Sequence, residues 1–323
     1  MRVNLFAHVV ATIPPKPAIT PPMAALAEFI HDGLRLLGYS AAGEETWFTL
    51  PELNVGFDVG RAPRDVLAVD HIFLSHGHMD HAAGLAYYCS QRMFLDNAPG
   101  HIYAPEPLID PIRRLLRLWA EIDGAEPPAE LHPVIPGSDI EVRRDLLIRP
   151  FEVCHVCRGR GGRRFQALGF TLIEVRRKLK DEFAGLLGPQ LVELKKRGVD
   201  ITRRVEMPLV AYCGDTGPGS FLALDHVRTS RILLLECTFV DDEHRERARA
   251  GNHMHIQDLR EVIPTLANGH ILLTHLTRRT PLPEARRALR AVVAEADLAR
   301  VSFLAEHRRR RRPREGPEAS GLP

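Results

Sequence analysis

The sequence predicts an α/β protein in which two β-sheets pack face to face and helices cover both outer surfaces, a four-layer αββα sandwich. Two observations lead to this fold class. Short apolar runs that suit buried strands recur along the chain and alternate with segments of helical periodicity. Several of these runs end in a single ionisable residue, so the predicted strands lead toward a common site.

The composition is that of a globular protein. The chain has 323 residues, of which 45% are hydrophobic and 26% charged, enough for one large domain or two small ones. Its five cysteines are scattered and do not suggest a disulfide framework. No apolar run reaches the roughly 18 residues of a membrane span, and the N-terminus does not resemble a signal peptide. We therefore expect a cytoplasmic protein without membrane contact.

Three regions differ in composition. Residues 1–30 are rich in proline and form an N-terminal extension, although Met23 to Leu37 could begin the fold as a short helix. Residues 31–300 carry the alternating pattern and form the main domain. Residues 307–323 are rich in arginine, proline and glycine, and we expect a disordered basic tail there.

Positive charge is concentrated in two places, although the net charge is only +2. Residues 158–204 contain thirteen Lys or Arg against five Asp or Glu, and residues 307–323 contain six against two. Such segments suit a polyanionic partner such as the phosphates of a nucleic acid. The alternative is a solvated charged surface with no partner.

The elements follow one another in a regular order. Antiparallel strands are predicted around residues 46–60, because two apolar runs flank a turn. Residues 69–74 form a buried strand, and helical spacing of apolar residues follows it. The later strands and helices rest on the same patterns: strands at 101–104, 145–153, 168–175, 208–213, 231–239 and 269–277, and helices at 82–94, 107–122, 241–250, 256–267 and 283–298.

The segment Ser75 to His81 follows the buried strand directly and reads Ser-His-Gly-His-Met-Asp-His. Four side chains that bind metals therefore lie within six positions. Neutral imidazoles and carboxylates are usual ligands of zinc and similar divalent ions. A loop can direct His76 and His78 one way and Asp80 and His81 another, so one segment can supply two adjacent metal sites.

Other strand ends supply further candidates. His155 and His275 would complete the two sites, and Asp215 would lie between them. Asp58 is either a carboxylate that accepts a proton from a ligating imidazole or a turn residue before glycine. The Cys154-His-Val-Cys157 run could instead be a zinc knuckle, but no second cysteine pair would close it.

The order and spacing of these residues resemble those of the metallo-β-lactamase superfamily. Residues 38–291 resemble ribonuclease Z, the tRNA 3′-processing endonuclease, especially its short plant-like form. Four stretches carry the resemblance, followed by His275 in the last strand-end position: Phe57–Arg61 with Ser75–His81, Arg176–Thr202, Leu235–Phe239 and Gly251–Ile256.

The resemblance implies a zinc-dependent hydrolase. His76, His78 and His155 would bind one zinc ion, and Asp80, His81 and His275 the second, with Asp215 shared; manganese or iron could replace zinc. Asp80, Glu236 and His253 would form the catalytic set. A bridging hydroxide would attack phosphorus, and His253, held protonated by Glu236, would protonate the leaving 3′ oxygen.

The resemblance also implies a partner. The segment 158–204 resembles the family's substrate-binding arm, so it would be an inserted basic arm that grips precursor tRNA. The family usually works as a homodimer, in which one subunit grips while the other cuts. The residues of the arm that we expect to contact RNA are Lys178, Lys180, Gly188, Pro189, Lys195, Lys196 and Arg197.

Some features depart from the family pattern. Residues 157–164 look inserted beside the site, and His255 is a second candidate for the role of His253. Two other functions stay open: a hydrolase of this fold that acts on a small phosphodiester, thioester or lactone, and a binding protein without activity. The basic arm speaks against a small substrate, and the complete set of ligand positions speaks against an inactive protein.

Overall fold

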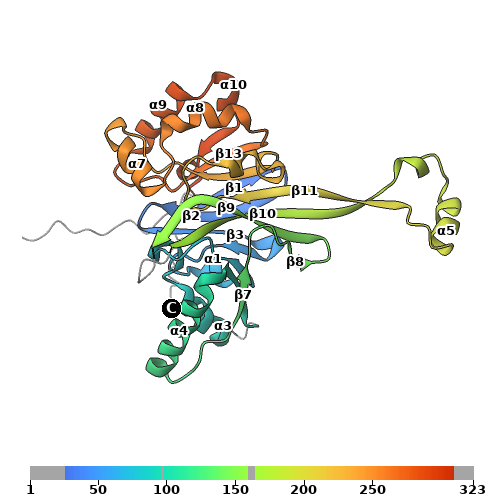
Figure 1. Ribbon diagram of the computed structural model, residues 1–323, viewed down its shortest axis with the longest axis horizontal. Helices are drawn as coiled ribbons and strands as arrows, with labels where there is room; N and C mark the ends of the chain where they lie inside the picture. Colours follow the sequence, from blue (N-terminus) through green and yellow to red (C-terminus); the bar gives the residue numbers. More distant parts are fainter. Residues whose placement is uncertain (1–25, 96–97, 159–163, 309–323) are drawn as a thin grey trace, which may run out of the picture.

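The computed structural model describes residues 26–95, 98–158 and 164–308 of the chain. In that part of the chain the strands form two seven-stranded sheets (Figure 1). The first sheet contains β1 (Ala27–His31), β2 (Leu34–Ala41), β3 (Glu45–Leu50), β4 (Val55–Phe57), β5 (His71–Phe73), β6 (Gly100–Pro105) and β7 (Ala129–Val134). The second contains β8 (Ile140–Arg143), β9 (Leu146–Arg158), β10 (Arg164–Leu179), β11 (Thr202–Tyr212), β12 (Ile232–Glu236), β13 (His270–Thr274) and β14 (Val301–Phe303).

The two sheets repeat one topology. In each, the first four strands pair antiparallel and the last four pair parallel, so the fourth strand belongs to both parts. The parallel strands β12 and β13 are almost wholly buried, which explains their continuous apolar sequences. Parallel strands end at the same edge of a sheet, so the residues that follow them in the sequence meet there.

One apolar core lies between the sheets. Phe57, Phe73, Phe170 and Tyr212 come from β4, β5, β10 and β11 and are all buried there. The rings of Phe57 and Tyr212 stack with their centroids 5.2 Å apart, which joins the first sheet to the second. These buried rings fix the position of one sheet on the other.

Helices cover both outer faces. Helices α1 (Arg64–Leu67), α3 (Leu85–Phe94) and α4 (Glu106–Asp123) pack on the first sheet, and α6 (Asp225–Arg228), α8 (Leu259–Val262) and α9 (Leu282–Val292) pack on the second (Figure 1). Each set forms its own apolar core with the sheet below it. The predicted four-layer αββα sandwich is thereby confirmed.

The start of the fold differs from the sequence prediction. The segment expected as a short helix between Met23 and Leu37 contains β1 and part of β2, which form an antiparallel pair. Ala27 and Phe29 are buried whereas Glu28 and Ile30 are not, which is the two-residue period of a strand. Pairing with β2 therefore outweighs the local helix propensity of the residues of β1.

The folded unit extends beyond residues 31–300 at both ends. It begins with β1, and β14 pairs with β13 after residue 300. Arg308, which falls within the expected basic tail, forms a β-bridge with Ala27. The remainder of the expected extension and tail, residues 1–25 and 309–323, lies outside the described residues.

The basic segment contains a long projection. Strands β10 and β11 continue as a two-stranded ribbon beyond the position where β9 ends its pairing with β10, and the ribbon carries α5 (Gly188–Lys196) at its tip (Figure 1). No residue of α5 is buried. The ribbon, its tip and α5, residues 175–206, are called the arm below.

No helix within the described ranges is long and apolar enough to span a membrane.

Candidate active site

Four segments bring the predicted ligands together at one edge of the sandwich. The loop His76–His81 follows β5, Asp215 follows β11, His275 follows β13, and His155 comes from β9. His155 does not stand at the end of its strand as expected, because β9 continues to Arg158. Three residues of β9 face one residue of β10 at this point, and such a bulge turns a side chain toward a neighbouring site.

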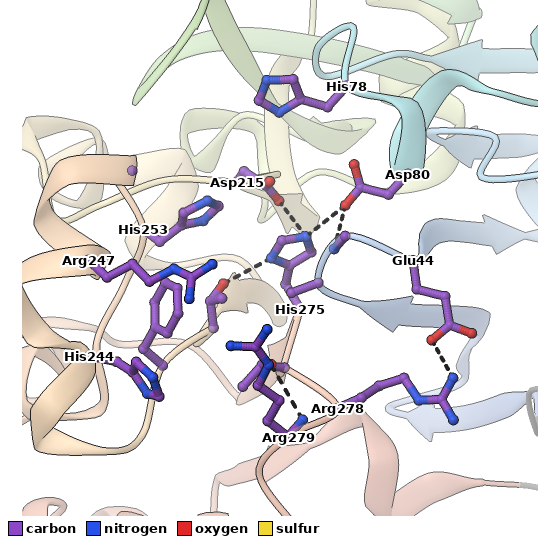
Figure 2. Close-up of a pocket in the computed structure, with 16 residues that line it drawn as sticks. Glu44, His78, Asp80, Asp215, His244, Arg247, His253, His275, Arg278 and Arg279 are labelled. Atoms are coloured by element: carbon purple, nitrogen blue, oxygen red, sulfur yellow. Dashed lines mark hydrogen bonds and ion pairs between the residues drawn. The ribbon is translucent and has the colours of Figure 1, made fainter. Parts of the chain in front are cut away.

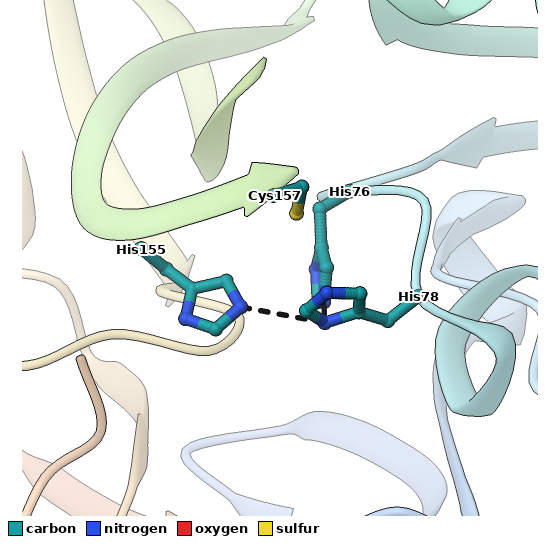
Figure 3. A group of neighbouring side chains, drawn as sticks. All are labelled: His76, His78, His155 and Cys157. Carbon is teal, nitrogen blue, oxygen red and sulfur yellow. Dashed lines mark hydrogen bonds between the residues drawn. The ribbon is translucent and has the colours of Figure 1, made fainter. Parts of the chain in front are cut away.

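The first group of donors contains three histidines. The Nε2 atom of His76 lies 3.0 Å from Nδ1 of His78, and Nε2 of His155 lies 3.4 Å from the same Nδ1 (Figure 3). Cys157 points toward the same group, and all four donor atoms lie within 4.8 Å of one another. The three predicted ligands of the first site are thus adjacent, and they lie beside the Cys157 thiol, which the sequence suggested only as part of a zinc knuckle.

The second group contains Asp80, His81 and His275. Oδ2 of Asp80 lies 3.4 Å from Nε2 of His275 and 3.8 Å from Nε2 of His81 (Figure 2 shows the first contact). His275 holds a backbone φ of +59°, which is uncommon for a residue other than glycine and costs about 1–3 kcal/mol. The surrounding fold therefore imposes this orientation on the imidazole.

Asp215 joins the two groups. Its Oδ2 lies 3.7 Å from Nε2 of His76, and its Oδ1 lies 3.2 Å from Nε2 of His81 and 3.3 Å from Nε2 of His275. Gly214 makes the turn before Asp215 with a φ of +60°, and a Cβ atom there would stand 3.0 Å from Cβ of Ser75. Each carboxylate oxygen therefore faces one group of imidazoles.

These seven residues fit two divalent cations. In a tetrahedral zinc site with bonds of about 2.0–2.1 Å, neighbouring donors are about 3.3 Å apart, and the distances here run from 3.0 to 3.8 Å. Nε2 of His81 and Oδ1 of Asp215 are buried without a hydrogen-bond partner. Buried polar atoms left unpaired are costly, and bound cations would satisfy both.

Asp58 makes a hydrogen bond to an imidazole of the second group. It is fully buried, and its Oδ2 lies 2.7 Å from Nδ1 of His81. Ser75 donates to the same carboxylate from its backbone N–H and its hydroxyl, and the Tyr212 hydroxyl donates from 2.5 Å. The geometry matches the first of the two roles considered for Asp58, a carboxylate that orients a ligating imidazole.

Other supporting contacts were missed at the sequence level. Nδ1 of His76 lies 2.9 Å from the Ser75 hydroxyl, and Nδ1 of His275 lies 2.9 Å from the Thr238 hydroxyl. Such contacts fix which nitrogen of each ring is free to bind a metal. The adjacency of Ser75 to His76 was a visible signal, whereas the contact of Thr238 with a residue 37 positions away depends on the folded chain.

Glu236 and His253 form a pair beside these groups. Nδ1 of His253 donates to Oε1 of Glu236 at 2.8 Å, and Glu236 is fully buried. The carboxylate also accepts from the backbone N–H of Thr216 and from the Thr238 hydroxyl. Nδ1 is occupied in this way, so Nε2 is the nitrogen of His253 that is available to a substrate in the pocket (Figure 2).

The electrostatics of this pair favour a protonated imidazole. Burial lowers the pKa of His253, but the charge of Glu236 and its hydrogen bond outweigh burial and raise the pKa to about 9. An imidazolium at neutral pH can donate a proton, as a general acid must.

His255, the second candidate for this role, faces elsewhere. Its Nδ1 accepts from the backbone N–H of Gln257, and its Nε2 lies 3.1 Å from the carbonyl oxygen of Asp241. Both ring nitrogens are thus used in local contacts at the start of a short 3₁₀ turn. The structure leaves His253 as the imidazole that reaches the pocket.

The protonation of the ligand groups suits cation binding. Burial lowers the pKa of His76, His78 and His155, which keeps these imidazoles neutral. Burial opposes a charge on His81 as well, but Asp215 and Asp58 outweigh it and hold the pKa of His81 well above its ordinary value. A cation bound by His81 would replace this proton.

The carboxylates of the site are ionised. Burial raises the pKa of Asp80, but its hydrogen bond with His275 and the charge of His81 bring it down to about 2. For Asp215, burial again raises the pKa, and the charges of His275 and His81 hold it well below its usual range. Two negative ligands are therefore present at neutral pH.

A pocket of about 530 Å³ opens over these residues. Arg247, Arg278 and Arg279 line it together with Phe239, as Figure 2 shows in part. Arg278 is paired with Glu44 at 2.9 Å, whereas the guanidinium of Arg247 lies over the Phe239 ring, 6.0 Å from its centroid. Arginine side chains and an aromatic ring beside a candidate metal centre suit a nucleic-acid substrate, because arginine binds phosphates and an aromatic ring stacks on bases.

The predicted RNA-contacting residues lie on the arm, away from this pocket (Figure 1). Arg177 is paired with Asp200, and Arg203 with Asp181. The five predicted cations make no such ion pair with any described residue, and Gly188 and Pro189 begin α5 at the tip. The unpaired cations are Lys178, Lys180, Lys195, Lys196 and Arg197.

Two stacked sheets that gather six donor residues around one shared aspartate define a hydrolase of the metallo-β-lactamase fold. A family model described as "Beta-lactamase superfamily domain" matches residues 52–179. A crystal structure of the metallo-β-lactamase fold protein YhfI from Bacillus subtilis is similar in fold, with a TM-score of 0.56 and 15% identity over 82% of this chain and 92% of that one.

The chain belongs to the tRNase Z, or ribonuclease Z, family. It is 32% identical over 256 residues to tRNase Z TRZ2, chloroplastic, of Arabidopsis thaliana, which covers 78% of this chain and 70% of the relative. It is 31% identical over 266 residues to tRNase Z TRZ1 of the same plant, which covers 81% of this chain and 91% of the relative. The predicted family is thereby confirmed.

Proposed function

We propose that this protein is a metal-dependent endoribonuclease that removes 3′ trailers from precursor tRNA. Membership of the tRNase Z family supports the reaction. The observation that carries the assignment to this pocket is the Glu236–His253 pair, 2.8 Å apart beside two groups of metal donors. A substrate phosphodiester in the pocket would meet metal donors, a proton donor and arginine side chains together.

His76, His78 and His155 would hold one cation, Asp80, His81 and His275 would hold another, and Asp215 would serve both. Two such cations, zinc in this proposal, would activate water and stabilise negative charge on the phosphate oxygens. Burial raises the pKa of the Cys157 thiol to about 11, which disfavours the thiolate that a metal would need. The proposal therefore assigns the imidazoles and carboxylates as the ligands.

The reaction is hydrolysis of one phosphodiester. The oxygen of water forms a bond to phosphorus, and the bond between phosphorus and the 3′ oxygen of the tRNA breaks. His253 donates its proton to that leaving oxygen, and Glu236 holds the imidazole in place and favours its charged form. The products are a tRNA with a 3′-hydroxyl and a trailer with a 5′-phosphate.

The arm would bind the tRNA at a distance from the cut. Its five unpaired cations can contact phosphates, and its exposed surface suits the shape of a folded RNA rather than a base sequence. The arm projects well beyond the body of the sandwich (Figure 1). The protein would therefore recognise the body of the tRNA in one place and cleave its end in another.

We also propose a homodimer and a cytoplasmic site of action. The adjacent helices α3 and α4 expose large apolar side chains, including Phe94 at 68%, Ile122 at 66% and Trp119 at 45%. A second copy of the chain would cover such side chains, and analytical ultracentrifugation measures its presence.

The cysteines support the proposed cytoplasmic site of action. All five cysteines are free thiols, which fits a reducing compartment.

The test of function uses purified protein and two substrates, a 3′-extended precursor tRNA and a small chromogenic phosphodiester. The variant joins Arg176 to Val205, which are paired across the ribbon, through an Asn-Gly turn in place of residues 177–204. It should lose most tRNA cleavage and keep activity on the small substrate. Equal loss of both, in a folded variant, or equal retention of both would contradict the proposal.

A further inference from the structure

A second cluster of metal-binding side chains lies at the opposite end of the first sheet's parallel strands. His71 begins β5, whereas the loop of the candidate active site follows the other end of this strand. His71 pairs with His101 of β6, and His101 pairs with Glu130 of β7. His132 lies two residues after Glu130 and therefore projects from the same face of the sheet.

Three of these residues present their donor atoms to one another. Nδ1 of His101 lies 3.2 Å from Nε2 of His132 and 3.2 Å from Oε2 of Glu130, and Nε2 of His132 lies 3.9 Å from the same oxygen. These separations are close to the roughly 3.3 Å between donors of a tetrahedral zinc ion. The three side chains are between 31% and 54% exposed, so a cation can enter from solvent.

Both imidazoles are held in place by neighbouring rings. His132 stacks on Tyr103 with the centroids 4.5 Å apart and the planes 18° apart. His101 stacks on His71 at 4.8 Å and 10°. Rings that are already oriented lose little conformational entropy when they bind a ligand.

The chemistry of the three donors indicates which metals the cluster can bind. Two imidazoles and one carboxylate suit zinc, cobalt, nickel or copper, whereas magnesium and calcium prefer oxygen ligands alone.

We propose that His101, Glu130 and His132 bind a divalent transition-metal ion at a third metal site, with solvent completing its coordination. The site joins β6 to β7, which is the last strand of its sheet. A cation bound there links the edge strand β7 to its neighbour β6 through metal–ligand bonds. Its role is therefore structural, and it is independent of the proposed tRNA cleavage.

The experiment titrates Zn²⁺ into holoenzyme whose active site is already saturated, and follows binding by calorimetry and total zinc by elemental analysis. The wild-type chain should bind one further Zn²⁺ per chain, and its Tm should rise by about 3 °C or more at saturating zinc. His132→Gln and Glu130→Gln should each weaken this binding at least tenfold. His226→Gln, which removes an imidazole outside the cluster, should leave it unchanged.

Cleavage of precursor tRNA serves as the folding check, because each variant should keep it at the wild-type rate. No further zinc in the wild-type chain, or further zinc that His132→Gln binds as tightly, would overturn the third site. If the wild-type chain itself does not cleave precursor tRNA, the proposed function is overturned. The number of zinc ions bound, and with it the third site, is unaffected by that result.

Discussion

Replacing His253 with alanine removes the imidazole that we assign as the proton donor. The structure places it against Glu236 at 2.8 Å, with its Nε2 available to the pocket. Burial lowers the pKa of His253, but the charge of Glu236 and its hydrogen bond raise it to about 9, which favours a protonated ring at neutral pH. Without this proton the 3′ oxygen must leave as an alkoxide, so the cleavage step should slow sharply.

The expected loss is about 100-fold to 10,000-fold in the rate of cleavage, the usual contribution of a general acid. In free energy this is about 3–5 kcal/mol of barrier height. Zinc content should stay at the wild-type level, because none of the seven assigned ligands is changed. A control, His226→Ala, removes an imidazole that bonds Thr171 instead and should change the rate little.

Single-turnover cleavage of two precursor tRNAs tests the role directly. One carries the natural 3′ oxygen at the cleaved linkage, and the other carries sulfur there, which leaves as a thiolate without a proton. His253→Ala should be at least 100-fold slower than wild type on the first and within about tenfold on the second. An equal defect on both substrates would refute the assignment of His253 as the acid.

Three further predictions follow from the same geometry. Asp58→Asn should weaken binding of the second cation about 10–100-fold, measured by zinc competition with a chromogenic chelator; unchanged affinity would contradict the role of Asp58. The triple change of Lys195, Lys196 and Arg197 to alanine should raise KM for tRNA with kcat unchanged, and should reduce the salt slope of log KM by about 2–3; an unaltered slope would exclude them as phosphate contacts. The kcat should fall as pH rises through the pKa of His253, which is about 9 and is lowered by bound cations. This alkaline fall in kcat should be absent in His253→Ala.

The sequence revealed the metal-binding residues that a short stretch of the chain is enough to recognise. The loop from His76 to His81 holds four potential metal ligands within six consecutive positions, and the apolar run before it placed the loop at the end of a strand. His155, Asp215 and His275 were found because each was expected at the end of a buried strand; Asp215 and His275 do follow one, whereas His155 lies within β9. The structure brings all of these residues together at one edge of the sandwich, with neighbouring donor atoms 3.0 to 3.8 Å apart.

The remaining features depend on strand pairing, which sequence patterns do not display. The hydroxyl of Tyr212 reaches Asp58 across 154 positions, and Thr238 reaches His275 across 37. The cluster of His101, Glu130 and His132 exists only because β6 and β7 are adjacent in register. The helix expected between Met23 and Leu37 was wrong over its described residues, 26–37, for a related reason, since the pairing of β1 with β2 overrides local propensity.

The way in which the arm leaves its sheet has a consequence for substrate choice. The pairing of β10 with β11 shifts register between Leu172 and Ile173, opposite Pro208, which cannot donate to the ladder. Past Glu174, where β9 ends its pairing with β10, only two strands remain, and narrow ribbons twist more than broad sheets. The surface proposed to bind tRNA is therefore carried by two strands alone, whereas the candidate active site, where Asp215 follows β11, rests on the whole sheet.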